Sequence, residues 1–193
     1  MREISPNRIL LVDDDPSVRE FLSRRLEEEG FETLEATDGI DGLMKLRNEL
    51  PGAIISDLQM PRMSGFEFVS VVRRRFPFIP VIVLSGSFPK EDVSEDVEPD
   101  VWLKKGELNF AELIETLRDL VRTRPHDIEL PQIVKTPVRT RPGSAGYVFL
   151  TCPDCLRTFR AMCPPGNKTV ELTAVCTHCE PRVPFLMESS ATA

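Results

Sequence analysis

Short apolar runs alternate with amphipathic stretches along the first 122 residues. An apolar run of roughly four to eight residues is typical of a buried strand, and apolar residues three or four positions apart are typical of a half-buried helix. By the first pattern, we expect strands over residues 9–12, 31–36, 53–58, 81–85 and 101–104. By the second, we expect helices over residues 15–30, 38–50, 64–76 and 110–121, and a short or frayed helix over residues 88–100.

Capping residues support the limits of these helices. Asp15 followed by Pro16 is a typical helix start, and Gly30 is a typical end. Asp38 is expected to cap the second helix, and Pro51 to stop it. The residues expected to point into the core are Val18, Phe21, Leu22 and Leu26 in the first helix, Ile40, Leu43, Leu46 and Leu50 in the second, and Phe66, Val69 and Val72 in the third.

Strands that alternate with helices in this way form a parallel sheet with right-handed crossover connections. We therefore predict an α/β fold with a doubly wound, five-stranded parallel sheet for residues 1–122. The alternation stops there, and four prolines predict an extended linker over residues 123–146. A small β module over residues 147–187 and a tail over residues 188–193 complete the expected domain organisation.

Charge and composition narrow the function classes. The chain has 193 residues and a net charge of −7, and 41% of its residues are hydrophobic, which is typical of a globular protein. Neither residues 1–122 nor residues 123–193 carry the strong basic excess of a nucleic-acid-binding domain. No apolar run has the length of a membrane span, so we expect a cytoplasmic protein without membrane insertion. Arg73, Arg74 and Arg75 end the third predicted helix, where their charges suit the helix dipole.

Carboxylates gather at predicted strand ends. Asp13, Asp14 and Asp15 follow the first strand, and Asp57 follows the third. Since ligands bind at the carboxyl ends of parallel strands, these acids should converge in one crevice, except for Asp15, which caps a helix. An acidic pocket lined by oxygen atoms suits Mg²⁺, and Asp57, alone at its strand end, is the candidate nucleophile for a phosphoryl group. Lys105, at the end of the fifth strand, is placed to contact a phosphoryl oxygen.

Residues 1–122 resemble the receiver domain of two-component response regulators. The motifs that carry the resemblance are Leu11-Val12-Asp13-Asp14-Asp15-Pro16, Asp57-Leu58-Gln59-Met60-Pro61-Arg62-Met63-Ser64-Gly65, Ser85 after an apolar strand, and Lys105 after Trp102-Leu103. The resemblance implies a flavodoxin-like fold and a phosphorelay in which a histidine kinase donates the phosphoryl group. It also implies that the protein is no enzyme beyond catalysing its own phosphoryl transfer and dephosphorylation.

The resemblance further implies a role for each site residue. Asp57 is the phosphoacceptor, and the ligands of Mg²⁺ are Asp13, Asp14, Asp57 and the backbone carbonyl of Gln59. Ser85, Lys105 and Trp102 are the residues that contact the phosphoryl group or respond to it. The sequence departs from the family where Gly106 stands in place of the usual proline, and Lys104 is an alternative to Lys105.

The five cysteines all lie in the last quarter of the chain. Cys152 and Cys155 form one Cys-x-x-Cys pair, and Cys176 and Cys179 form another, a spacing typical of a four-cysteine zinc site. Residues 147–187 resemble small bacterial zinc ribbons, with strands expected over residues 147–151 and 170–175. Disulfides, a redox dithiol and unligated thiols are the alternatives.

Two details of this module depart from the usual pattern. Leu156 and Glu180 replace the glycines that usually follow each cysteine pair, in turns that favour the left-handed backbone region. Cys163 is expected to pack as a small apolar residue or to serve as a spare ligand, and His178 to be a surface residue.

Taken together, these features predict an atypical response regulator that signals through protein–protein contacts of the receiver and of the zinc ribbon. The alternative is a phosphorylation-controlled regulator whose ribbon binds nucleic acid, which the charge of the ribbon argues against. The expected partners are a histidine kinase and an unidentified protein bound by the ribbon, and homodimerisation stays open.

Overall fold

The structure is a computed structural model, and it describes residues 4–86, 98–123, 138–140, 147–162, 170–180 and 182–187. A five-stranded sheet lies at the centre of the N-terminal part. Its strands are β1 (Ile4–Val12), β2 (Glu32–Ala36), β3 (Leu50–Ser56), β4 (Val81–Ser85) and β5 (Val101–Lys104). Their order is β2-β1-β3-β4-β5 and every pair is parallel, so the predicted doubly wound sheet is confirmed.

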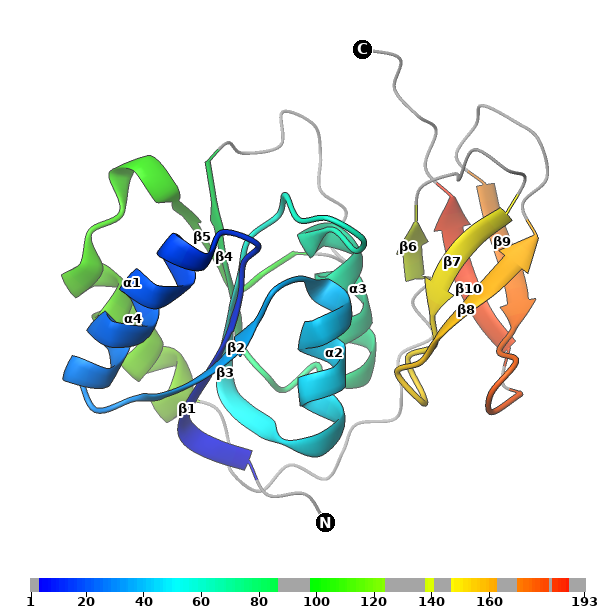
Figure 1. The fold of residues 1–193 in the computed structure, drawn as a ribbon. Coiled ribbons are helices and arrows are strands. Elements are labelled where there is room, and N and C mark those ends of the chain that lie inside the picture. The colour runs from blue at the N-terminus through cyan, green and yellow to red at the C-terminus, as the bar shows by residue number, and fades with distance from the viewer. Residues whose placement is uncertain are drawn as a thin grey trace.

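Helices cover both faces of this sheet. Figure 1 shows α1 (Pro16–Glu28) and α4 (Phe110–Thr123) on one side, and α2 (Gly39–Asn48) and α3 (Gly65–Arg75) on the other. Each pair encloses its own buried cluster, because alternate strand residues point to opposite faces: Leu10 and Ile54 pack toward α2 and α3, and Leu11 and Ile55 toward α1 and α4. We call residues 4–123 the α/β unit.

Side-chain caps fix where the helices begin. The Asp15 carboxylate accepts a hydrogen bond from the Ser17 amide at 2.8 Å, and that of Asp38 accepts one from the Asp41 amide at 2.9 Å. Ser64 and Glu67 form a capping box at the start of α3. The predicted caps at Asp15 and Asp38 are therefore confirmed.

One expectation about the core and one about the end of α2 were wrong. Phe21 is 55% exposed, because α1 buries a narrow stripe through Leu22 and Leu26 and Phe21 lies beside that stripe. Leu50 is buried but opens β3 instead of ending α2, and Pro51 lies inside the strand. The reason is that β1 begins at Ile4, five residues before its predicted start, and its first residues pair with Leu50 and Pro51.

Some sequence predictions fall outside the described residues, among them most of the frayed helix over 88–100. After β5 the chain makes a short 3-10 turn, η2 (Lys105–Glu107). Every peptide bond in the described ranges is trans, including the one between Lys105 and Gly106. None of the helices described here is long and apolar enough to cross a membrane.

The described residues of the C-terminal part form five strands in two small sheets, and we call this part the cysteine module. β7 (Tyr147–Thr151) pairs with β8 (Thr158–Met162), and β9 (Val170–Val175) pairs with β10 (Arg182–Met187), both antiparallel. Strands 147–151 and 170–175 have their predicted limits. β6 (Val138–Thr140) pairs with β10 in parallel, so the segment predicted as a linker over 123–146 contributes a strand.

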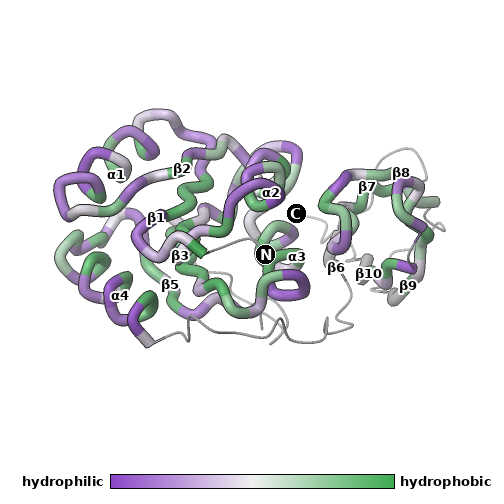
Figure 2. The backbone as a smooth tube through the Cα atoms, turned by 90° about the horizontal axis from the view of Figure 1, so that it is seen from below, coloured by the Kyte–Doolittle hydropathy of each residue, from purple (hydrophilic) through white to green (hydrophobic). Residues whose placement is uncertain are grey.

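The cysteine module packs against α3. Figures 1 and 2 both show β6 and the β7–β8 hairpin beside α2 and α3. One buried cluster runs from Val72 and Phe76 of the α/β unit to Leu150 and Phe159 of the module. The two parts therefore share apolar surface.

Candidate functional site

The carboxyl ends of β1 and β3 form an acidic crevice, which we define by Asp13, Asp14, Asp57 and Lys105. The Asp57 amide donates to the carbonyl of Val12 at 2.8 Å, so the two strand ends are tied together. Asp13 and Asp57 are buried, with exposed fractions of 4% and 7%, and Asp14 is exposed. One oxygen from each of the three carboxylates lies within 4.8 Å of the others. The expected convergence at the point where the strand order reverses is therefore found.

Lys105 brings a positive charge into direct contact with the carboxylates of this crevice. Its Nζ lies 2.7 Å from Oδ2 of Asp13 and 2.7 Å from Oδ2 of Asp57. Lys104 points elsewhere and pairs with Glu107. Of the two candidate lysines, the structure thus places Lys105 against the acids.

Burial changes the proton affinity of these groups. It raises the pKa of Asp13 above that of an ordinary aspartate, and the hydrogen bonds from Lys105 and from the Asp15 amide only partly offset that rise. Burial lowers the pKa of Lys105, but the bonds to Asp13 and Asp57 outweigh it, so that the pKa is raised overall. Lys105 therefore stays charged, and protons and cations compete for Asp13.

The backbone around Asp57 connects this crevice to α3. The amide of Leu58 donates to Oδ1 of Asp57 at 2.6 Å, and the amide of Gly65 donates to the carbonyl of Leu58 at 2.9 Å. A Cβ atom at Gly65 would lie 1.9 Å from the Asp57 carbonyl oxygen, which no side chain tolerates. Because only glycine fits there, α3 begins in direct contact with the backbone of Asp57.

The remaining predicted site residues lie on β4, on β5 and in the segment after β3. Ser85 is the buried last residue of β4, opposite Lys104 in the register of β5. Trp102 is half-buried in β5, and its ring centroid lies 6.5 Å from that of Phe66 on α3. Gln59 is exposed, two residues after Asp57.

Sequence reasoning missed Arg19 of α1. Its guanidinium donates to the backbone carbonyl of Asp13 at 2.7 Å, and it lines a small cavity together with Asp13 and Asp57. The only signal was its position four residues after the cap Asp15, which places it on the first turn facing the strand end.

The cysteine module brings four thiols together. The Sγ atoms of Cys152 and Cys179 are 3.6 Å apart, those of Cys155 and Cys176 are 3.8 Å apart, and those of Cys176 and Cys179 are 3.6 Å apart. A tetrahedral zinc ion about 2.3 Å from each sulfur sets neighbouring sulfurs about 3.8 Å apart. The four thiols therefore fit a zinc ion.

Each pair of cysteines sits in a tight turn. The amide of Leu156 donates to the carbonyl of Cys152 at 2.7 Å, and the amide of Glu180 donates to that of Cys176 at 3.0 Å. Both residues have left-handed backbone angles, with φ of 55° and 65°. The predicted turn conformations are thus adopted without glycine, at the cost of some strain.

The thiols differ in acidity in the metal-free protein. Burial raises the pKa of Cys152 to about 11 and also raises that of Cys179. Burial acts in the same sense on Cys176, but hydrogen bonds from backbone amides, first that of His178, outweigh it and lower the pKa. The His178 ring is turned away from the thiols, with Nε2 3.1 Å from the Thr158 carbonyl, and Cys163 lies outside the described residues.

Arg74 is a second residue that sequence reasoning missed. Its neighbours Arg73 and Arg75 are half-buried, and Arg73 binds Asp100 at 2.7 Å, but Arg74 is only 5% exposed. Burial lowers the pKa of Arg74, and the charges of Asp154 and Cys152 act against that change. We expected Arg74 only to interact with the helix dipole. Its charge also lies at the contact with the cysteine module.

Comparison with known proteins finds relatives of the α/β unit. The family model of the response regulator receiver domain matches residues 9–105. The response regulator MprA of Mycobacterium sp. (strain KMS) is 35% identical over 127 residues, which is 63% of this chain and 54% of that protein. The chain thus spans about half the length of the curated relatives it matches.

Solved structures resemble the same part of the chain. The chemotaxis protein CheY4 of Vibrio cholerae is 35% identical, with a TM-score of 0.53, over 58% of this chain and 97% of that one. The response regulator TrrA of Thermotoga maritima, solved with Mg²⁺ and BeF, is 33% identical, with a TM-score of 0.54, over 62% and 99%. TrrA has also been solved in complex with the histidine kinase ThkA; that match is 34% identical, with a TM-score of 0.53, over 62% and 98%.

Proposed function

Because half of its residues match the receiver model, the chain belongs to the response regulator receiver family, and we propose that it is a phosphorylation-controlled regulator with Asp57 as its phosphoacceptor. One observation carries the assignment: the buried Asp57 carboxylate is held at a strand end, 2.7 Å from the Lys105 ammonium. This contact supports the assignment, because the nucleophile that would accept the phosphoryl group then lies beside the cation that would contact its oxygens.

The phosphoryl group would come from the phosphohistidine of a histidine kinase. A carboxylate oxygen of Asp57 attacks phosphorus, the bond between phosphorus and the imidazole nitrogen breaks, and the nitrogen keeps the electron pair. The complex of TrrA with ThkA supports this class of partner. Beyond this transfer and the later hydrolysis of the acyl phosphate, we propose no enzymatic activity.

The chain offers a matching site for Mg²⁺. Asp13, Asp14, Asp57 and the backbone carbonyl of Gln59 would hold the ion, and the three carboxylates have the oxygen ligands and the spacing that suit it. When bound, Mg²⁺ neutralises charge on the phosphoryl oxygens. The structure of TrrA with Mg²⁺ and BeF supports the assignment.

Lys105 and Ser85 would then respond to the modified Asp57. Lys105 bridges Asp13 and Asp57 through single oxygens, and its ammonium can turn to a phosphoryl oxygen without leaving the crevice. Ser85 would donate its hydroxyl to another phosphoryl oxygen, and Trp102 would repack against Phe66. The result is a shift between two packed states of this face.

For the C-terminal part, we propose a four-cysteine zinc ribbon over residues 147–187, joined to a receiver domain over residues 1–122 by the segment 123–146. The near-tetrahedral sulfur spacing supports the metal, and the segment is too small to build an adequate core without it. A protein partner is the proposed target of the ribbon. Nucleic-acid binding is the alternative, and salt-dependent binding of random DNA or RNA would favour it.

Phosphorylation by acetyl phosphate tests the assignment of Asp57. Wild-type protein with Mg²⁺ should gain one phosphoryl group in its intact mass, and Asp57→Asn should gain none. Asp119→Asn, a change of the same kind on exposed α4, is the matched control and should be labelled like wild type. Full labelling of Asp57→Asn would overturn the assignment.

A further inference from the structure

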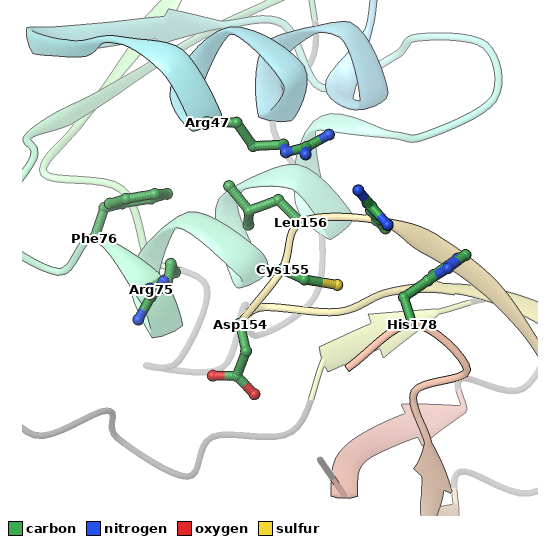
Figure 3. Close-up of a pocket in the computed structure, with 8 residues that line it drawn as sticks. Arg47, Arg75, Phe76, Asp154, Cys155, Leu156 and His178 are labelled. Atoms are coloured by element: carbon green, nitrogen blue, oxygen red, sulfur yellow. The ribbon is translucent and has the colours of Figure 1, made fainter. Parts of the chain in front are cut away.

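A cavity of about 380 Å³ lies at the seam between the α/β unit and the cysteine module. We call it the seam cavity, and Figure 3 shows the residues around it. The residues that line it come from both parts of the molecule: Arg47, Arg75 and Phe76 from the α/β unit, and Asp154, Cys155, Leu156, Arg157 and His178 from the module. Its volume lies in the range of sites for small molecules, about 300–1,000 Å³.

Three of these residues are arginines, and none of the three has a neutralising partner among the described residues. In the described part of the chain, the guanidinium groups of Arg47, Arg75 and Arg157 form neither an ion pair nor a hydrogen bond. Arg47 and Arg75 lie at the C-terminal ends of α2 and α3, where the helix dipole explains a basic residue. That reason does not apply to Arg157, which lies on the turn after the first cysteine pair.

The lining of the seam cavity contains one carboxylate, that of Asp154. The charge of Asp154 acts on the buried Arg74, which does not line the cavity. Figure 3 shows the Asp154 carboxylate directed away from Arg47. One carboxylate at Asp154 does not balance the three guanidinium groups of the lining.

Guanidinium groups suit one class of ligand in particular. Their planar forks bind phosphate and carboxylate oxygens in pairs, and phosphate carries the larger charge. Phe76 and Leu156 form an apolar wall beside the arginines, which limits water around a bound group. We propose that the seam cavity binds the phosphate group of a small molecule, held by Arg47 from the α/β unit and by Arg157 from the cysteine module.

This ligand would connect the two parts of the protein. Arg47 and Arg157 belong to different parts, so one anion between them favours the packed arrangement and their mutual repulsion disfavours it when the anion is absent. The inference rests on the proposed zinc site, since the first cysteine turn positions Leu156 and Arg157.

Pyrophosphate is the probe that tests the seam cavity. The titration uses the zinc-loaded full chain, at low salt and without Mg²⁺, and calorimetry reports binding. We expect saturable binding by wild type, weakened about tenfold or more in Arg47→Gln and in Arg157→Gln, since each loses a charge-assisted contact. Lys45→Gln on the same helix and Arg182→Gln in the same module are charge-matched controls outside the cavity, and both should bind like wild type.

The zinc content of each sample is measured after the titration. If the protein retains zinc but shows no saturable binding of pyrophosphate, the proposed phosphate site in the seam cavity is wrong and the proposed zinc site is unaffected. An equal loss in Lys45→Gln also overturns the proposed phosphate site, because the attraction would then be general. Protein that neither holds zinc nor binds pyrophosphate overturns both proposals.

Discussion

The α/β unit and the cysteine module each bring distant residues together at a site suited to a metal ion, but they differ in what holds the site. The acidic crevice lies on a sheet whose central strands are buried on both faces, so its geometry rests on packing. The cysteine module has two small sheets, and two of its most buried residues are the thiols Cys152 and Cys176. The fold of the α/β unit therefore positions the acidic crevice, whereas we propose that bound zinc would complete the fold of the cysteine module.

The two sites also differ in how they balance charge without metal. The acidic crevice has its own cation, because Lys105 bridges Asp13 and Asp57. In the cysteine module, burial instead raises the pKa of Cys152 to about 11, so this thiol keeps its proton when no metal is bound. Metal removal should therefore affect the two parts very differently.

Zinc removal should give the largest effect. Chelation should unfold the cysteine module, because a structural zinc site contributes about 10 kcal/mol or more to a small domain. Hydrogen exchange should show lost protection in β7 to β10 and retained protection in β1 to β5. Removal of Mg²⁺ is the control and should leave both parts folded. A module that keeps its protection in chelator would contradict the comparison.

Replacement of Lys105 should give the next largest effect. Lys105→Met removes the cation beside Asp57, and the initial rate of phosphorylation should fall about 10²-fold, as for the loss of one electrostatic contact in a transition state. Lys104→Met is the matched control, because Lys104 pairs with Glu107 outside the acidic crevice. Phosphorylation is followed by intact mass over time. Equal initial rates in the two variants would show that Lys105 does not assist phosphorylation of Asp57.

Replacement of Arg74 tests the contact between the two parts. Arg74→Met keeps much of the buried volume but removes the charge beside Asp154 and Cys152, so we expect a loss of about 1–3 kcal/mol in unfolding free energy. Denaturant unfolding of the zinc-loaded chain measures it. Arg75→Met, at the half-buried neighbouring position, should cost much less. Similar losses in both would show that the buried charge has no special role.

A change of pH should give the smallest effect. The pKa of Asp13 is raised, so its carboxylate takes up a proton at a higher pH than an ordinary aspartate, whose pKa is about 3.9. Its ionisation thus disfavours the metal-free fold above the raised pKa, and Mg²⁺, which needs the carboxylate, should bind more weakly as pH falls through it. Titrations at about pH 7 and about pH 5 should show weaker binding at the lower pH. Tighter binding of Mg²⁺ at the lower pH would contradict this prediction.

Much of the fold could be predicted because short-range patterns decide it. Strand β4 follows from a short apolar run, and helix caps such as Asp15 follow from local capping chemistry. The early start of β1 could not be predicted, since it depends on pairing with Leu50 and Pro51 across the sheet. The same holds for β6, whose three residues form a strand only against β10.

The candidate sites show the same division. The acids could be predicted to converge because each follows a predicted strand, and the two cysteine pairs because of their Cys-x-x-Cys spacing. The structure brings each group together. Arg74 carries no such signal, because a run of three arginines does not say which one the fold will bury. Arg47 and Arg157 meet only through the packing of two separate parts.

Native mass spectrometry of the zinc-loaded chain after incubation with acetyl phosphate and Mg²⁺ tests the central claim most directly, because it reports both sites in one molecule. We predict a species with one zinc ion and one phosphoryl group, and fragmentation should place that group on Asp57. A phosphoryl group on another residue, or labelling that Asp57→Asn does not prevent, would contradict the proposed phosphoacceptor.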